Sequence, residues 1–436
     1  LIILKMYLAV ALVGGVILLG CFWYDIRIGL WMTIFSVLLG QVVRLSVGSG
    51  GILVSDVLMG LLTVVWLVNI FVRKQRVNWN VVLMALVLFL IISLMVNWRA
   101  TNDIHTTDEM TMWLYWARLV LYSMFLPIVW SITNWYKEGR RYLIWLLVMG
   151  MTLLAVGFLQ LVFLPNIIFL AQYGWDPHVG RMLSTFLDPN FLGALLTFFF
   201  AICFAFYFRY PAWGDGKKMF WLIMCVLFAA GVALTYSRST FLAMGVSFVI
   251  LAYMFDKRVL LFGAVAGLML FFGSPRIMER VEGMYKVDLT AQKRITSWED
   301  NWSIIRDNMW YGVGYNNLLS ENIRRGFVTD AKLHSGAGSD SSYMTVWSTM
   351  GLVGLGSYLL LWILIVGLLL NIYKNEQNDL LLRWLAIGTA AGIMGVIVHA
   401  QFTNSLLYNH IYMVILYAVG VCLGWAAESK KEMTKK

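Results

Sequence analysis

The sequence predicts an all-α, polytopic membrane protein, and three observations lead to that fold class. Of the 436 residues, 61% are hydrophobic and only 13% are charged, whereas charged residues make up about a quarter of a soluble globular chain. Apolar runs of the length that a spanning helix needs, about 17–25 residues, recur from one end of the chain to the other. The 20 Trp and 20 Tyr agree with this class, because both residues favour the headgroup level of a bilayer.

The apolar runs predict about 12–14 transmembrane helices. Residues 1–273 hold the N-terminal transmembrane helices, residues 342–436 hold the C-terminal ones and a tail, and residues 274–341 form a long hydrophilic loop between them. The expected spans lie near residues 7–23, 29–47, 52–72, 79–97, 111–134, 141–164, 189–209, 219–235, 239–255, 258–273, 342–372, 380–403 and 408–426.

Basic clusters predict how these helices are oriented. Lysine and arginine gather in every second loop and in the tail, at residues 73–76, 137–141, 209–218, 257–258, 374 and 430–436. Because basic loops stay in the cytoplasm, the C-terminus is expected there and the 274–341 loop on the opposite, extracytoplasmic side. The net charge of +10 is thereby explained by helix orientation, and we expect no nucleic-acid partner.

The 274–341 loop is expected to be folded. A loop of this length in a compact protein is usually functional or disordered. Large apolar residues recur in it at near-helical spacing, which argues against disorder. We therefore predict short helices packed over the membrane face; the residues are Trp298, Trp302, Ile304, Ile305 and Trp310.

The first candidate site residue is Arg238, in the sequence Thr-Tyr-Ser-Arg-Ser-Thr at residues 235–240. Apolar runs flank it on both sides, so the arginine is costly unless it faces a polar cavity or an anion, or extends to the headgroups. On the outer side it would begin a helix, where its charge adds to the positive end of the helix dipole. Arg294, in the outer loop, is its expected companion. Two fixed cations on one side of a bilayer suit chemistry on a lipid-linked phosphate.

His334 is the candidate base, because it lies in a glycine-containing part of the outer loop and a histidine titrates near neutrality. Arg181 is a further candidate cation, and Arg118 lies within an apolar run and is expected to face protein or a cavity. No histidine and carboxylate pair has the spacing of a metal site, so we expect no metal. Four other histidines compete with His334, namely His105, His178, His399 and His410.

In their order along the chain, these pieces resemble the O-antigen ligase and O-antigen polymerase (Wzy-type) superfamily of bacterial membrane glycosyltransferases. The resemblance runs from Arg181 to Leu355, and residues 1–180 match in hydropathy alone. Its elements are Arg181, Leu-Asp-Pro-Asn-Phe-Leu-Gly at 187–193, Leu-Thr-Tyr-Ser-Arg-Ser at 234–239, Arg294 with Trp298, Tyr-Gly-Val-Gly-Tyr-Asn-Asn at 311–317, Asp-Ser-Ser-Tyr-Met at 340–344 and Gly-Leu-Val-Gly-Leu at 351–355.

The resemblance implies a GT-C-type fold and a glycan donor carried on a polyprenyl diphosphate. It implies metal-independent, inverting transfer without a cofactor, at the outer face of the bacterial plasma (inner) membrane, with other polysaccharide assembly proteins as possible partners. Arg238 and Arg294 match the arginines that engage the donor diphosphate, and Arg181 and Asn190 lie in a matching motif. His334 is the best counterpart of the base.

The chain departs from the ligase pattern directly before the 342–372 helix. Ligases often carry His-Asn there, where this chain has Ser339-Asp340, and His334 lies earlier in the loop. Either the loop brings His334 into the site, or Asp340 acts as the base. This departure favours a polymerase over a ligase that transfers to lipid A core or a cell-wall polymer.

Two other classes explain less of the sequence. A flippase of lipid-linked oligosaccharides would account for the many spans, but it should also show an internal repeat, and we find none in the sequence. A structural scaffold of an export complex would need neither Arg238 nor His334.

Overall fold

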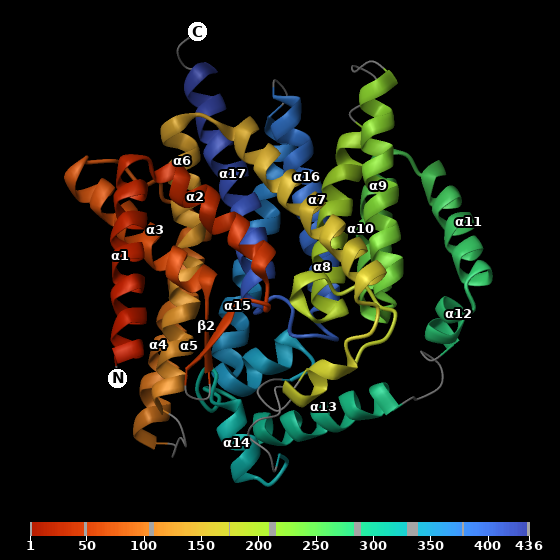
Figure 1. Ribbon diagram of the computed structural model, residues 1–436. Helices are drawn as coiled ribbons and strands as arrows, with labels where there is room; N and C mark the ends of the chain where they lie inside the picture. Colours follow the sequence, from red (N-terminus) through yellow and green to blue (C-terminus); the bar gives the residue numbers. More distant parts are fainter. Residues whose placement is uncertain are drawn as a thin grey trace.

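The computed structural model describes residues 2–47, 50–103, 109–173, 175–208, 215–282, 289–328, 339–376 and 379–433. Helices dominate this part of the chain (Figure 1), which confirms the all-α polytopic prediction. The helices are α1 (Ile2–Tyr24), α2 (Ile26–Phe35), α3 (Val54–Val72), α4 (Val81–Asp103), α5 (Glu109–Ser123), α6 (Phe125–Tyr136), α7 (Gly139–Phe163), α8 (Pro189–Phe208), α9 (Asp215–Thr235), α10 (Arg238–Phe255), α11 (Arg258–Gly273), α12 (Pro275–Glu282), α13 (Leu289–Asp307), α14 (Leu318–Arg324), α15 (Ser342–Asn375), α16 (Leu380–His399) and α17 (Asn409–Met433).

Within the described ranges, ten helices are long and apolar enough to cross a membrane. They are Val54–Val72, Val81–Asn102, Glu109–Tyr136, Gly139–Phe163, Pro189–Phe208, Gly216–Thr235, Arg238–Phe255, Ser342–Asn375, Leu380–His399 and Asn409–Ser429. Three shorter apolar helices, Val13–Tyr24, Ile26–Leu39 and Arg258–Gly273, occupy the other places where the sequence predicts a span.

The predicted span at 29–47 is wrong in detail. Helix α2 ends at Phe35, a 3₁₀ turn follows at Ser36–Leu39, and the chain then forms the hairpin of β1 (Arg44–Val47) and β2 (Gly50–Leu53). The chain leaves the helical path at Gly40, and the next N–H, of Gln41, donates to the carbonyl of Thr185 at 2.9 Å. This docking against the segment before α8 ends the helix although the apolar run continues.

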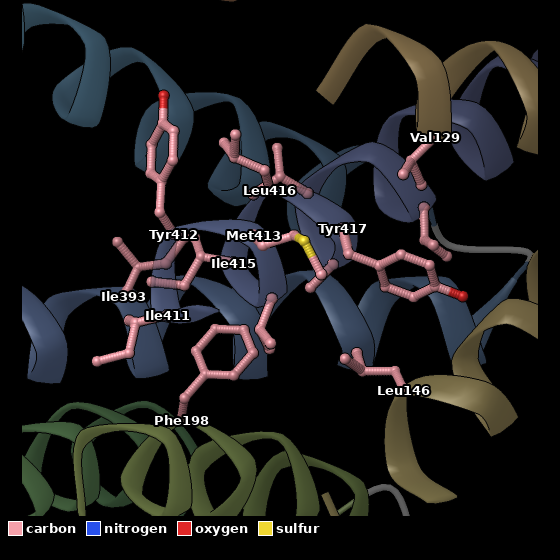
Figure 2. Packing of buried hydrophobic residues seen from close by; sticks show 14 of the residues in the cluster. Val129, Leu146, Phe198, Ile393, Ile411, Tyr412, Met413, Ile415, Leu416 and Tyr417 are labelled. Atoms are coloured by element: carbon pink, nitrogen blue, oxygen red, sulfur yellow. The ribbon is translucent and has the colours of Figure 1, made fainter. Parts of the chain in front are cut away.

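The core of the bundle is built around α17, which is almost completely enclosed by other helices. Figure 2 shows Met413 and Tyr417 of α17 between side chains that come from neighbouring elements, such as Phe198 of α8 and Leu146 of α7. The Tyr417 hydroxyl donates to the Tyr142 carbonyl at 3.0 Å, so this buried polar group is satisfied. Buried apolar side chains of α8, α16 and α17 thus make a close-packed centre against which the peripheral helices pack.

Polar caps begin the helices that meet at one end of the bundle. The Asp188 carboxylate accepts from the N–H groups of Asn190 and Phe191 at 2.6 and 3.3 Å, with Pro189 in the first turn of α8. The Ser341 hydroxyl likewise accepts from the N–H of Met344 in the first turn of α15. Such caps satisfy amide groups that a helix start leaves without partners, so these starts are well defined.

The described part of the long loop between α11 and α15 contains α12, α13 and α14. In Figure 1 the α13 and α14 helices lie at one end, and the α6–α7 connection and the C-terminal end of α17 lie at the other. Ile304 packs with Val313 and Leu318 in a small separate core. Trp302 and Trp310 are 44% and 60% exposed, whereas Ile304 and Ile305 are buried.

Helix α15 is broken at Gly351, and the segment that follows α13 fills the break. Gly351 has φ 68°, which interrupts the helical hydrogen bonds. The N–H groups of Leu352 and Val353 donate to the carbonyls of Met309 and Trp310 at 2.8 and 3.4 Å. In the other direction, two N–H groups of the 311–317 segment donate to carbonyls of α15: Val313 to Ser348 at 3.0 Å and Gly314 to Thr349 at 2.9 Å. Main-chain pairing therefore fixes the segment after α13 to the bundle.

Candidate active site

The turn between α9 and α10 is held from two sides by arginines. Nε of Arg181 donates to the Thr235 carbonyl at 2.8 Å, and a terminal nitrogen of Arg181 approaches the Tyr236 carbonyl at 3.4 Å. On the other side the Arg276 guanidinium of α12 lies 4.2 Å from the centre of the Tyr236 ring. Arg276 also donates to the carbonyl of Gly180 at 2.7 Å. The turn, the 179–181 segment and α12 are thereby joined.

Arg238 is the first residue of α10, directly after this turn, and its side chain is half-buried. The preceding residue, Ser237, makes no capping hydrogen bond to α10. Its hydroxyl donates instead to Oδ1 of Asn190, at the start of α8, at 2.7 Å. The predicted residues Arg238 and Asn190 therefore meet at one corner, where the starts of α8 and α10 adjoin. The positive end of the α10 dipole lies at the same place.

Several arginines share this corner, and the electrostatics of Arg181 reveal it. The pKa of the Arg181 guanidinium is lowered to about 10, first by burial and then by repulsion from Arg280. Arg276 and Arg294 add to this repulsion, and the nearby Asp188 opposes it. The structure thus brings Arg181 and Arg294, two of the predicted cations, near each other and adds two arginines of α12. Such an excess of fixed positive charge favours an anionic ligand.

Asp340 lies just before α15 and interacts electrostatically with Arg294. Its side chain is exposed, yet enough protein surrounds it to desolvate the carboxylate, and this raises its pKa; Asp176 raises it further and Arg294 opposes the change. A carboxylate with a raised pKa accepts a proton more readily than an ordinary surface aspartate. Asp340 therefore has the environment of a candidate base, whereas His334 lies outside the described residues.

Arg118 has a different environment from the other predicted cations. It pairs with Asp56 at 2.6 Å and also donates to the Gly51 carbonyl, with about 15% of its side chain exposed. It thereby links α5 to α3 and β2. The Arg118 side chain therefore faces protein, and the ion pair offsets its charge.

The sequence interpretation missed two residues of this corner, Arg276 and Arg280, and did not single out a third, His399, from the competing histidines. Arg276 and Arg280 lie one helical turn apart on α12, so they share a face. His399, the last residue of α16, is fully buried and its Nε2 lies 3.2 Å from Oγ of Ser239, the residue after Arg238. The Arg-x-x-x-Arg spacing within the hydrophilic loop was the available signal for the first two; nothing in the sequence distinguished His399 from the other histidines.

The chemistry that this corner can perform follows from its groups. Guanidinium groups do not lose their protons in the physiological range and bind phosphate oxygens with paired N–H groups. A nearby carboxylate can accept a proton. Within the described part of the chain, no group of three or more His, Cys, Asp or Glu could hold a metal ion.

Comparison with known protein families supplies one match. Residues 223–359 match the family model described as O-antigen ligase. The matched region contains the α9–α10 turn, α12, α13 and the broken part of α15, and with them Arg238, Arg276, Arg280, Arg294 and Asp340; Arg181 and Asn190 precede it. No curated protein matches the chain.

Proposed function

We propose that this multi-pass membrane protein is a polysaccharide polymerase of the O-antigen ligase and polymerase superfamily, and the family match at residues 223–359 supports the proposal. It would transfer glycan from a polyprenyl-diphosphate-linked donor to a sugar hydroxyl of a lipid-linked acceptor. The observation that supports this best is the gathering of arginines around the α9–α10 turn, inside the matched domain. A diphosphate leaving group needs such a setting.

In the proposed reaction, the acceptor hydroxyl attacks the anomeric carbon of the donor glycan. The new carbon–oxygen bond forms as the bond from that carbon to the diphosphate oxygen breaks, and the electron pair leaves with the diphosphate. Asp340, or alternatively His334, takes the hydroxyl proton. Arg238 and Arg294 stabilise the charge that grows on the leaving group, and Arg181 adds to the local positive field. One preorganised donor of this kind contributes about 3–4 kcal/mol.

The same proposal specifies the membrane in which the protein lies and its orientation there. The protein would lie in the bacterial plasma (inner) membrane, with α13, α14 and the arginines on the extracytoplasmic side and the C-terminus in the cytoplasm. The α6–α7 connection, which carries a basic cluster, and the end of α17 both lie opposite α13 and α14, as the positive-inside rule requires (Figure 1). We further propose a GT-C-type fold and transfer without a metal ion.

The second candidate is a ligase, and the specific observation in its favour is that the matching family model is itself described as O-antigen ligase. The acceptor would then be lipid A core or a cell-wall polymer. Ser339-Asp340 in place of His-Asn before α15 is the feature that leads us to prefer the polymerase.

Purified protein in lipid vesicles, incubated with polyprenyl-diphosphate oligosaccharide, tests both. A ladder of products on a gel supports the polymerase, and the ladder should persist in EDTA. A single block transferred only when lipid A core or a cell-wall polymer is added supports the ligase. If donor crosses the vesicle membrane and no new glycosidic bond forms, the protein is a flippase and the proposal is wrong.

A further inference from the structure

His399 makes polar contacts on both sides of its ring although it is fully buried. On one side Nε2 lies 3.2 Å from Oγ of Ser239 and 3.4 Å from Oγ1 of Thr240, both in the first turn of α10. On the other side Nδ1 lies 3.1 Å from Oγ of Ser405, in the connection between α16 and α17. Either neutral tautomer leaves each nitrogen with a partner, because each hydroxyl can donate or accept.

A line of side-chain hydrogen bonds continues from His399 beneath the start of α10. The Ser239 hydroxyl lies 3.1 Å from that of Ser237, and the Ser237 hydroxyl donates to Asn190 Oδ1 at 2.7 Å. The line therefore runs from the end of α16, under α10, to the start of α8. Ser237 and Ser239 are buried, so a broken line would leave polar groups without water to replace the lost partner.

Arg238 lies between the two serines of this line. Its backbone is consequently held through Ser237 to α8 and through Ser239 to α16. Groups that stabilise a transition state must be held within about 0.5 Å of their productive geometry, and a misplacement of about 1 Å can reduce the rate about 100-fold. The line supplies the restraint that the start of α10 lacks, since Ser237 does not cap it.

The same connection also reaches the segment that carries Asp340. The Ser342 N–H donates to the Ala400 carbonyl at 2.8 Å, and Ser342 Oγ accepts from the Leu406 N–H at 3.2 Å. Residues 400–406 are thus bonded both to His399, through Ser405, and to the first residue of α15. The buried imidazole of His399 is therefore linked both to the start of α10, which carries Arg238, and to the start of α15, which follows Asp340.

We propose that His399 is a positioning residue, which sets the start of α10 so that Arg238 meets the donor diphosphate. The inference rests on the proposed function for its ligand, and it adds a role that the arginines alone do not explain. His399 acts through Arg238 and does not touch the diphosphate.

Two conservative variants of the full-length chain separate positioning from packing. The amide of His399→Gln can occupy the place of Nε2 and keep the Ser239 contact, whereas the amide of His399→Asn reaches only the place of Nδ1. We expect His399→Gln to bind polyprenyl diphosphate within about 3-fold of the native protein and His399→Asn to bind about 10-fold more weakly, a loss of the size of one buried hydrogen bond. Both variants should still transfer glycan, His399→Gln at a higher rate than His399→Asn.

A double-variant comparison provides the decisive measurement. His399→Asn should weaken polyprenyl diphosphate binding in the native chain and have no further effect in the Arg238→Ala background, because residues that act through one group are not additive. His410→Gln is the matched control: His410 is equally buried near the same end, but its neighbours are the rings of Phe186 and Tyr408. It should leave binding unchanged.

Equal binding by the Gln and Asn variants, or an equal loss with and without Arg238, would overturn the inference. If His399→Asn does not fold, as judged by its thermal unfolding, Ser239→Ala replaces it in the same comparison, with the same expectation. Binding and transfer separate the two proposals. If the native protein and its variants bind polyprenyl diphosphate as expected but the native protein transfers no glycan, the proposed glycan transfer is refuted and the positioning role of His399 stands.

Discussion

Arg238 combines a fixed charge with a fixed place at the start of a helix. Replacing it with alanine removes the guanidinium that we assign to the leaving diphosphate, and the transfer rate should fall about 100- to 1000-fold. Arg238→Lys should also be impaired, because an ammonium cannot reproduce the paired N–H groups of the guanidinium. Glycan transfer by purified protein measures both variants.

Arg258 is the matched control for this prediction. It begins α11 at the far end of α10, and its side chain is 90% exposed beside Asp256. Arg258→Ala should transfer glycan at the native rate and unfold at the native temperature. Product of full length from Arg238→Ala at an unchanged rate would refute the role of Arg238.

His178 makes the stability of the arginine corner depend on pH. Burial and the charge of Arg181 lower its pKa to about 4, with Arg280 adding to the effect and Asp176 opposing it. The folded state therefore binds this proton less readily than the unfolded chain, whose histidine has a pKa of about 6.5. The contribution of neutral His178 to the free energy of unfolding is fully present above pH 6.5. It is lost as the pH falls toward 4, and the loss is on the order of 1–3 kcal/mol.

The acid sensitivity can be isolated by comparing the native protein with His178→Gln. The thermal unfolding temperature, measured by tryptophan fluorescence, should fall more between pH 7 and pH 4.5 for the native chain than for the variant. Identical drops would show that His178 does not carry the effect. The comparison is needed because Asp188 and Asp340 have raised pKa values and respond to acid in the opposite direction.

At the residue scale, the sequence predicted some of the residues of the candidate site but not how they are arranged in space. Arg238 was recognisable because a charge beside two apolar runs must have a partner. Arg276 and Arg280 were missed although their i, i+4 spacing puts them on one helix face, because loop arginines are usually solvated. His399 gave no signal, because its partners are ordinary serines brought close by folding.

At the scale of elements, the break in α15 depends on a glycine. Gly351 has φ 68°, where a Cβ is strained, and a Cβ there would overlap the Trp310 carbonyl. Gly351→Ala should therefore lower the free energy of unfolding by about 2–4 kcal/mol, from the backbone strain and the overlap together. Thermal unfolding and proteolysis within the α12–α14 segment would report the change.

Gly356 provides the control on the same helix. A Cβ added there meets nothing within 4 Å, and the residue is helical. Gly356→Ala should be neutral or stabilising by up to about 1 kcal/mol, since alanine favours a helix. If the two variants unfold at the same temperature, the pairing at the break does not stabilise the protein.

Element existence followed from the sequence more reliably than element length. Most predicted spans correspond to helices, because an apolar run of sufficient length in a bilayer has to satisfy its backbone within itself. The 29–47 run failed because a tertiary contact, from Gln41 to Thr185, ends the helix within an apolar segment. The break at Gly351 also lay inside a single predicted span, 342–372, so hydropathy did not locate it.

For the whole molecule, we predict that α13 faces the outside of the cell. Cysteine placed at Glu299, an exposed position on α13, should react with a membrane-impermeant maleimide in intact cells. Cysteine at Arg258, at the opposite end of α10, should react only after the membrane is opened. The labelling requires replacement of the exposed native Cys21 by serine. Reversed reactivities would refute the proposed orientation and, with it, the reaction on the outer leaflet.

The pairing between the 309–314 segment and the broken α15 has a mechanical consequence. Hydrogen bonds run in both directions across it, two from each partner, so the segment after α13 cannot swing away as a lid without tearing them. The 309–314 segment and the helices of the bundle therefore stay joined throughout the reaction that we propose. If the protein is the polymerase that we propose, the growing glycan must therefore move past side chains that keep their positions.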